Sequence, residues 1–187
     1  MKPTIVGIGG STRVGSTAER ALQIALQVAE EGGMQTALFN GVFLADLPIY
    51  SPENTARTAP QRELVEAVRG ADGLILATPG YHGGISGLVK NALDLLEDLR
   101  DDRRPYLEGR AVGCIVTASG PQTLGTALAG MRSVIHALRG WPTPLGAGLN
   151  ISDRLFDASG RCTHEAAAAQ IAGVARQVVE FASRWRA

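Results

Sequence analysis

The chain has 187 residues, and its 18 Lys and Arg balance 18 Asp and Glu, so the formal charge is zero. Zero net charge argues against a nucleic acid or membrane surface held by a basic face. No stretch approaches the roughly 20 apolar residues of a spanning helix, and no secretory signal is recognisable. We therefore expect a cytoplasmic protein with no nucleic-acid or membrane partner. The two cysteines, Cys114 and Cys162, form no CxxC pair or His/Cys cluster, so neither a disulfide nor a metal site is predicted.

Short apolar runs alternate with segments of helical period along the whole chain, which is typical of an α/β sheet. Residues 4–9 are apolar on both faces, as in a buried parallel strand, and a helix over about 18–31 follows. Residues 36–39 predict the second strand. The stretch from Gly41 to Ala59 then reads as a long loop, and such loops are usually functional or interfacial.

The middle of the chain continues the alternation. Pro60 suits the first position of a helix, and residues 74–77 predict the third strand. A glycine-rich loop over 80–86 leads into a third helix. The apolar residues of that helix are Leu88, Ala92, Leu95, Leu96 and Leu99.

Two further strand–helix units complete the chain. The fourth strand is predicted at 112–116, with a helix running to Arg139, and the fifth strand lies near 145–149. Thr163 is the expected N-cap of the last helix. Five units predict a doubly wound, five-stranded parallel sheet with helices on both faces, in one domain over 1–187.

The first strand–helix loop, Gly9 to Thr17, has the chemistry of an anion site. It joins a buried strand to a helix N-terminus, where free N–H groups and the helix dipole favour negative charge. Hydroxyls of Ser11, Thr12, Ser16 and Thr17 and the guanidinium of Arg13 can add donors to phosphate oxygens.

Three kinds of phosphate loop compete for this stretch. A dinucleotide fingerprint would need glycine at Thr12 and a carboxylate near Asn40, and a triphosphate loop would need lysine at Ser16. A single terminal phosphate fits best. The alternative is structural, with the serines only capping the helix and Arg13 at the surface.

The loop after the third predicted strand suits a flat ligand. Glycines at 80, 83, 84 and 87 expose backbone and leave one side without bulky cover. Tyr81 and His82 supply planar side chains at the rim, so this loop can hold a ring system.

Three stretches together resemble the NADPH-dependent FMN reductase family, which has the flavodoxin-like fold. They are 10–16, similar to GSxRxxS; 79–94, similar to P-x-Y-[NH]-x-x…KNALD; and Ser119-Gly120. The resemblance implies strand order 2-1-3-4-5 and one FMN-binding domain. It also implies that the phosphate is held by Ser11, Arg13, Ser16 and Thr17, the isoalloxazine by Pro79, Gly80, Tyr81, His82 and Gly83, and its pyrimidine side by Ser119 and Gly120.

The implied activity is an oxidoreductase that moves hydride from NADPH or NADH to FMN N5. Electrons then pass to a flavin, a quinone or another small-molecule acceptor. A flavin needs no catalytic triad, so no catalytic residue is predicted. The alternative is a non-enzymatic FMN electron carrier of flavodoxin type, but zero charge and 5% aromatic residues favour the reductase.

Four residues in or after the loop over 80–86 are expected to have structural or contact roles rather than catalytic ones. Lys90, Asn91 and Asp94 are interpreted as capping, pairing and positioning residues, and His82 as a contact or hydrogen-bond donor. A homodimer or homotetramer is expected from the resemblance. The loop from 41 to 59 and the cluster Leu95, Leu96 and Leu99 also suggest surplus apolar surface.

Overall fold

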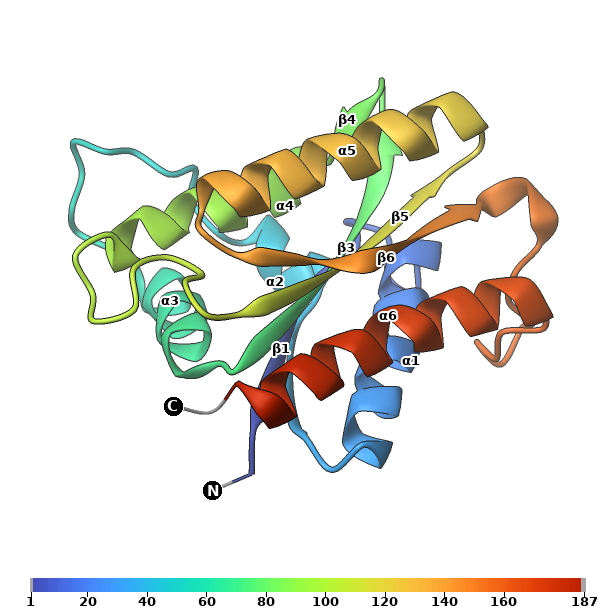
Figure 1. The fold of residues 1–187 in the computed structure, drawn as a ribbon. Helices are drawn as coiled ribbons and strands as arrows, with labels where there is room; N and C mark the ends of the chain where they lie inside the picture. Colours follow the sequence, from blue (N-terminus) through green and yellow to red (C-terminus); the bar gives the residue numbers. More distant parts are fainter. Residues whose placement is uncertain (1, 186–187) are drawn as a thin grey trace.

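The computed structural model describes residues 2–185, drawn in Figure 1. Five parallel strands form one sheet in the order β2-β1-β3-β5-β6. They are β1 (Thr4–Gly9), β2 (Gln35–Phe39), β3 (Gly73–Tyr81), β5 (Ala111–Ala118) and β6 (Trp141–Asn150). The short β4 (Gly84–Ile85) pairs antiparallel with the end of β3. Counted over the parallel strands alone, the predicted order 2-1-3-4-5 is confirmed.

Helices cover both faces of the sheet, as Figure 1 shows. One face carries α1 (Thr17–Glu31) and α6 (Glu165–Arg184). The other carries α2 (Gly41–Ala45), α3 (Ala59–Gly70), α4 (Gly87–Asp94), the 3₁₀ helix η1 (Leu95–Leu99) and α5 (Pro121–Ala137). Within residues 2–185, no helix is long and apolar enough to cross a membrane.

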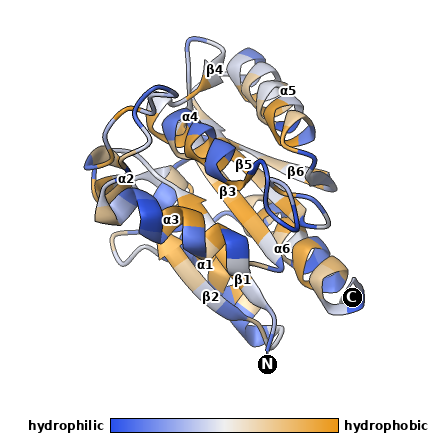
Figure 2. Ribbon diagram, turned by 90° about the vertical axis from the view of Figure 1, so that its left-hand side faces the viewer, coloured by the Kyte–Doolittle hydropathy of each residue, from blue (hydrophilic) through white to orange (hydrophobic). Residues whose placement is uncertain are grey.

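The core divides into two clusters because successive strand residues point to opposite faces. On β1, Val6 and Ile8 pack toward α3 and α4, whereas Ile5 packs toward α1 and α6. All three side chains are fully buried. Figure 2 shows the same division, with hydrophobic strands between helices whose outer faces are hydrophilic.

The segment 41–59 was predicted to be a loop, but its first five residues form the helix α2, so the prediction is wrong for residues 41–45. The Asn40 side chain accepts from the Phe43 N–H at 3.0 Å and starts α2, which ends at Ala45. Five residues are too few to show a clear helical period, so the sequence did not indicate this helix. The segment 46–58 is irregular, and α3 begins with Thr58 as N-cap. Pro60 lies in the first turn of α3 at its second position, one residue later than predicted.

The predicted glycine-rich loop over 80–86 is a β-hairpin. Strand β3 continues to Tyr81, and Gly80 and Tyr81 pair with Ile85 and Gly84 of β4. The two residues between, His82 and Gly83, have φ values of 50° and 83°. Two-residue hairpins of type I′ need positive φ at both central positions. Gly83 suits this requirement, whereas His82 is not one of the residues such a turn favours, which explains why the hairpin was not predicted.

The expectation that Leu95, Leu96 and Leu99 offer surface to a second subunit is wrong. The third helix breaks after Asp94 into η1, and all three leucines are fully buried in the core. An oligomer remains a prediction that rests on the family resemblance.

Two further boundaries differ from prediction. The last strand runs over 141–150, whereas 145–149 was predicted. The prediction was too short because Pro142 and Pro144 interrupt the apolar pattern of the strand. An edge strand tolerates proline, since one side of its backbone needs no partner. His164, not Thr163, is the N-cap of α6, and its Nδ1 accepts from the Ala167 N–H at 3.2 Å.

Candidate functional site

The loop after β1 is fixed by close backbone packing. A Cβ on Gly9 would lie 2.0 Å from the carbonyl oxygen of Ala77, and a Cβ on Gly41 would lie 1.9 Å from that of Ser11. The N–H of Gly10 donates to the Ala77 carbonyl at 3.1 Å. Only glycine permits such approaches, so the loop is clamped between β3 and the start of α2.

The same loop leaves backbone donors at the start of α1. Ser16 caps the helix, its Oγ accepting from the Glu19 N–H at 3.3 Å, and the buried Glu19 carboxylate accepts from the Gly15 N–H at 3.2 Å. The N–H groups of Thr17 and Ala18 have no partner within the described residues. These donors and the helix dipole favour an anion.

A cavity of about 380 Å³, here called the first cavity, opens above this helix start. It lies at the carboxyl ends of β1, β3 and β5, where ligands of doubly wound sheets bind. Its lining residues are Ser11, Thr12, Arg13, Ser16, Thr17, Ala18, Pro79, Gly80, Tyr81, Thr117, Ala118, Ser119 and Ile151. The exposed Arg13 guanidinium has no hydrogen-bond or ion-pair partner between residues 2 and 185, so it is available to a ligand anion.

The first cavity brings together most of the residues predicted for a cofactor. Those that line it are Ser11, Arg13, Ser16, Thr17, Pro79, Gly80, Tyr81 and Ser119. His82, Gly83 and Gly120 do not line it. His82 and Gly83 form the hairpin tip, where a Cβ on Gly83 would lie 3.5 Å from Thr126 Oγ1 of α5, and Gly120 is the N-cap of α5. A cofactor role for these three residues stays a prediction.

Four lining residues were not predicted, namely Ala18, Thr117, Ala118 and Ile151. Thr12 also lines the cavity and was expected only as a hydroxyl donor of the loop. Residues 117–118 directly follow the fourth predicted strand and could have been found from that position. Ile151 gave no signal, because it enters the cavity from beyond an edge strand whose length was underestimated.

The lining has the chemistry that FMN requires. One end offers the α1 N-terminus, the Ser16 and Thr17 hydroxyls and Arg13, which suit a phosphate. The other end offers backbone and flat or apolar groups at Pro79, Tyr81 and Ile151, which suit a ring. A molecule with a terminal phosphate and a ring system therefore matches the donor set of this cavity.

The helix after the hairpin has structural functions, as predicted. Lys90 Nζ lies 2.5 Å from Asp94 Oδ1, one turn along α4. Asn91 positions a distant segment: its Oδ1 accepts from the Tyr50 N–H at 2.8 Å and its Nδ2 donates to the Pro48 carbonyl at 3.1 Å. The predicted local pair and positioning residue are thus confirmed, but the predicted capping role is wrong, because Ser86 caps α4 and Asp94 makes no side-chain capping bond to η1.

Two further observations concern the Cys114 thiol and the possible metal ligands within residues 2–185. Burial raises the pKa of the Cys114 thiol to about 12, so it stays protonated at neutral pH. No group of three or more His, Cys, Asp and Glu residues within 2–185 could hold a metal ion.

A parallel sheet of order 2-1-3-4-5, with a free helix start and a cavity at the reversal of its winding, defines a flavodoxin-like class of protein. Residues 3–151 match the model of one family within that class, NADPH-dependent FMN reductase. The chain belongs to the NADPH-dependent FMN reductase family.

Individual relatives agree with this assignment. The chain is 31% identical over 128 residues to an NAD(P)H-dependent FMN reductase of Pseudomonas aeruginosa, covering 67% of this chain and 64% of that relative. It is 35% identical over 92 residues to an FMN-dependent NADPH-azoreductase of Staphylococcus aureus, covering 49% of this chain and 45% of the azoreductase. Thus the chain aligns with less than two thirds of each relative's length.

A solved structure supports the fold over nearly the whole chain. The flavoenzyme NAD(P)H:(acceptor) oxidoreductase of Paracoccus denitrificans superposes with a TM-score of 0.78 at 19% identity, covering 98% of both chains. At this identity the likeness concerns the fold alone.

Proposed function

We propose that this protein is an NAD(P)H-dependent FMN reductase. The observation that carries the proposal is the first cavity, in which an unpaired helix N-terminus and Arg13 face the same space as Pro79 and Tyr81. Membership of the NADPH-dependent FMN reductase family supports the same reading. The proposal includes one FMN-binding domain over residues 1–187.

FMN bound in the first cavity would supply hydride chemistry at N5, which a protein of this kind needs only to bind, orient and shield. Arg13, Ser16 and Thr17 would hold the phosphate through charge-assisted and neutral hydrogen bonds. Pro79 and Tyr81 would position the ring. The full proposed cofactor set is Ser11, Arg13, Ser16, Thr17, Pro79, Gly80, Tyr81, His82, Gly83, Ser119 and Gly120.

The hydride donor in the proposal is NADPH or NADH. The electron acceptor is a small molecule such as a flavin, a quinone or an azo compound. Azo compounds are included because the Staphylococcus aureus relative is an FMN-dependent NADPH-azoreductase. A homodimer or homotetramer and a cytoplasmic location belong to the same proposal.

The visible spectrum of the purified protein tests this function. After addition of FMN and removal of the unbound fraction, the protein should retain a flavin spectrum that bleaches when NADPH or NADH is added without oxygen. Flavin retained without bleaching by either nucleotide would favour the electron carrier instead. A protein that retains no flavin would contradict both readings.

A further inference from the structure

The start of α1 carries a buried acid beside the proposed phosphate site. Glu19 is the third residue of α1 and is only 4% exposed. It does not line the first cavity, whereas Ser16, Thr17 and Ala18 just before it do. A carboxylate that is almost fully buried has lost most of its hydration, so it needs partners within the protein.

The Glu19 carboxylate has no cationic partner within residues 2–185. None of the ion pairs in this part of the chain includes it. The guanidinium of Arg20, the next residue, donates instead to the Asp157 carbonyl oxygen at 2.9 Å. Glu19 Oε2 accepts from the Gly15 N–H at 3.2 Å. A backbone N–H group and the positive end of the helix dipole therefore stabilise this charge in place of a lysine or arginine.

Glu19 uses the same features of the helix start that a phosphate would use. Free N–H groups remain at Thr17 and Ala18, in the same turn of α1, but the Gly15 N–H is already taken. A phosphate in the first cavity would thus meet the negative charge of Glu19 within one helical turn. Arg13, on the cavity side of the loop, supplies the opposite charge.

The position of the Glu19 side chain is fixed by the loop above it. Ser16 Oγ accepts from the Glu19 N–H at 3.3 Å, and a Cβ on Gly10 would lie 3.5 Å from the Glu19 Cβ. The stem of Glu19 is therefore packed beneath the backbone of the loop after β1. A charge held in such a buried place is screened by salt and water much less than a surface charge.

We propose that Glu19 is a specificity-determining residue of the flavin site. Its fixed negative charge lowers the affinity for the phosphate of FMN and so limits the preference for FMN over riboflavin. This role rests on the proposed function, because it requires FMN in the first cavity with its phosphate at the start of α1. Glu19 acts on the phosphate through its charge and not through contact with the ring, so its effect is confined to flavins that carry a phosphate.

Glu19→Gln separates the charge of Glu19 from its hydrogen bond. The amide oxygen of glutamine can still accept from the Gly15 N–H, but the negative charge is gone. FMN should bind this variant about five- to tenfold more tightly than wild type, because one unit of repulsion near a partly buried phosphate is removed. Riboflavin affinity should not change. Fluorescence titration with each flavin, without NAD(P)H, measures both affinities.

Glu31→Gln is the matched control. It removes the same charge from the exposed last residue of α1, about 18 Å further along the helix axis. Both flavins should bind it as they bind wild type. Glu19→Met, of similar length, removes the charge and the acceptor together. It should also raise the preference for FMN over riboflavin, but less than Glu19→Gln, because the Gly15 N–H then loses its partner.

The outcomes separate a charge effect from a change in loop shape. A preference for FMN that stays at the wild-type value in both Glu19 variants would overturn the role of Glu19. So would an equal rise in Glu31→Gln, which would reflect net charge alone. Equal tightening of FMN and riboflavin in Glu19→Gln would indicate a reshaped loop and would also overturn it. FMN that binds as expected but is not bleached in wild type by NADPH or NADH would contradict the proposed reductase, while the charge effect would stand.

Discussion

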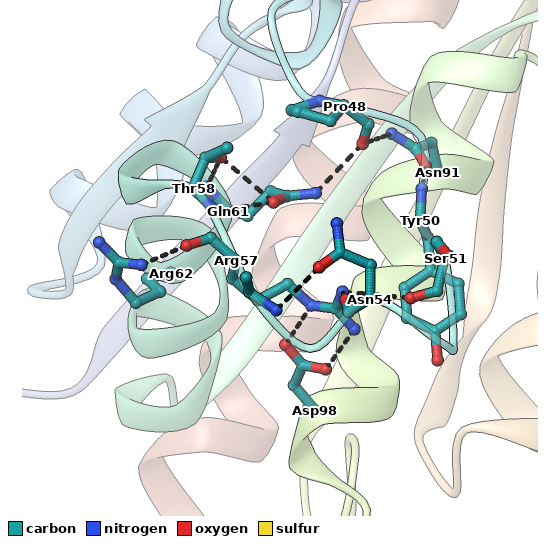
Figure 3. Close-up of polar contacts among 11 residues, drawn as sticks. Pro48, Tyr50, Ser51, Asn54, Arg57, Thr58, Gln61, Arg62, Asn91 and Asp98 are labelled. Carbon is teal, nitrogen blue, oxygen red and sulfur yellow. Dashed lines mark hydrogen bonds and ion pairs between the residues drawn. The ribbon is translucent and has the colours of Figure 1, made fainter.

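The loop after β1 borders the first cavity and the segment 46–58 borders a neighbouring one of about 420 Å³, but the two are held in opposite ways. The first is fixed by backbone against backbone at Gly9 and Gly41, which leaves the N–H groups of Thr17 and Ala18 and the guanidinium of Arg13 for a ligand. The second is held by side chains that reach in from α3 and α4 and take up its backbone groups (Figure 3). Donors for a ligand thus remain where the first loop enters α1, whereas the backbone groups of Pro48 and Tyr50 are used to hold the second segment in place.

The largest expected effect tests the backbone clamp of the first region. Gly41→Ala places a Cβ 1.9 Å from the Ser11 carbonyl oxygen, so we expect a loss of at least about 3 kcal/mol in the free energy of unfolding. Gly125→Ala is the control, because Gly125 lies exposed in α5 with nothing within 4 Å of a Cβ. It should gain about 0.5–1 kcal/mol. Urea unfolding of both variants measures this difference, and similar midpoints would refute the clamp.

The free donors of the first region are tested by Arg13→Ala. Removal of a charged hydrogen bond should weaken FMN binding by about 1.5–3 kcal/mol, since Arg13 has no partner in the described chain to reorganise. Riboflavin, which lacks the phosphate, should bind wild type more weakly and lose little further in the variant. Fluorescence titration gives both affinities. Equal affinity of wild type for riboflavin and FMN would contradict the phosphate assignment.

The side-chain contacts of the second region are tested by Asn91→Ala. The change leaves the Tyr50 N–H without its partner and removes one of the two donors to the Pro48 carbonyl, the other being Gln61 Nε2, which should cost about 1–2 kcal/mol of unfolding free energy. Hydrogen exchange at the Tyr50 amide should accelerate in the variant, while exchange in the loop after β1 should not change. Acceleration in both regions to the same extent would show that they are not held separately.

The smallest effect is expected at the outer anchor of the 46–58 segment. The Arg57 guanidinium makes two hydrogen bonds to the Asp98 carboxylate, at 2.8 and 2.9 Å, and lies over the Tyr50 ring. The hydrogen bond to Asp98 raises the pKa of Arg57. Because such pairs near solvent contribute little, Arg57→Ala should cost about 0.5–1 kcal/mol. Arg100→Ala, which removes an exposed single contact to Glu97, should cost less. Thermal unfolding measures both variants. A larger loss of stability in Arg100→Ala than in Arg57→Ala would contradict the claim that Arg57 anchors the 46–58 segment.

The comparison also explains what the sequence could predict. The loop after β1 was recognisable because its function is local: glycines, hydroxyls and Arg13 lie within nine residues. The contacts that hold the segment 46–58 were not, because the bonds from Asn91 to Pro48 and Tyr50 span more than forty residues and follow no spacing rule. The same holds for Leu95, Leu96 and Leu99, whose burial depends on α3 packing over them. Periodicity predicts which face is apolar but not which surface covers it.

Anaerobic stopped-flow mixing of the FMN-loaded protein with NADPH, and separately with NADH, tests the central claim most directly. The first cavity is expected to hold FMN by its phosphate and leave its ring accessible to nicotinamide. Flavin absorbance should therefore fall in a single turnover with at least one nucleotide. Riboflavin should bleach in the same way but bind more weakly. An absorbance that stays constant with both nucleotides would contradict the reductase account and favour an electron carrier.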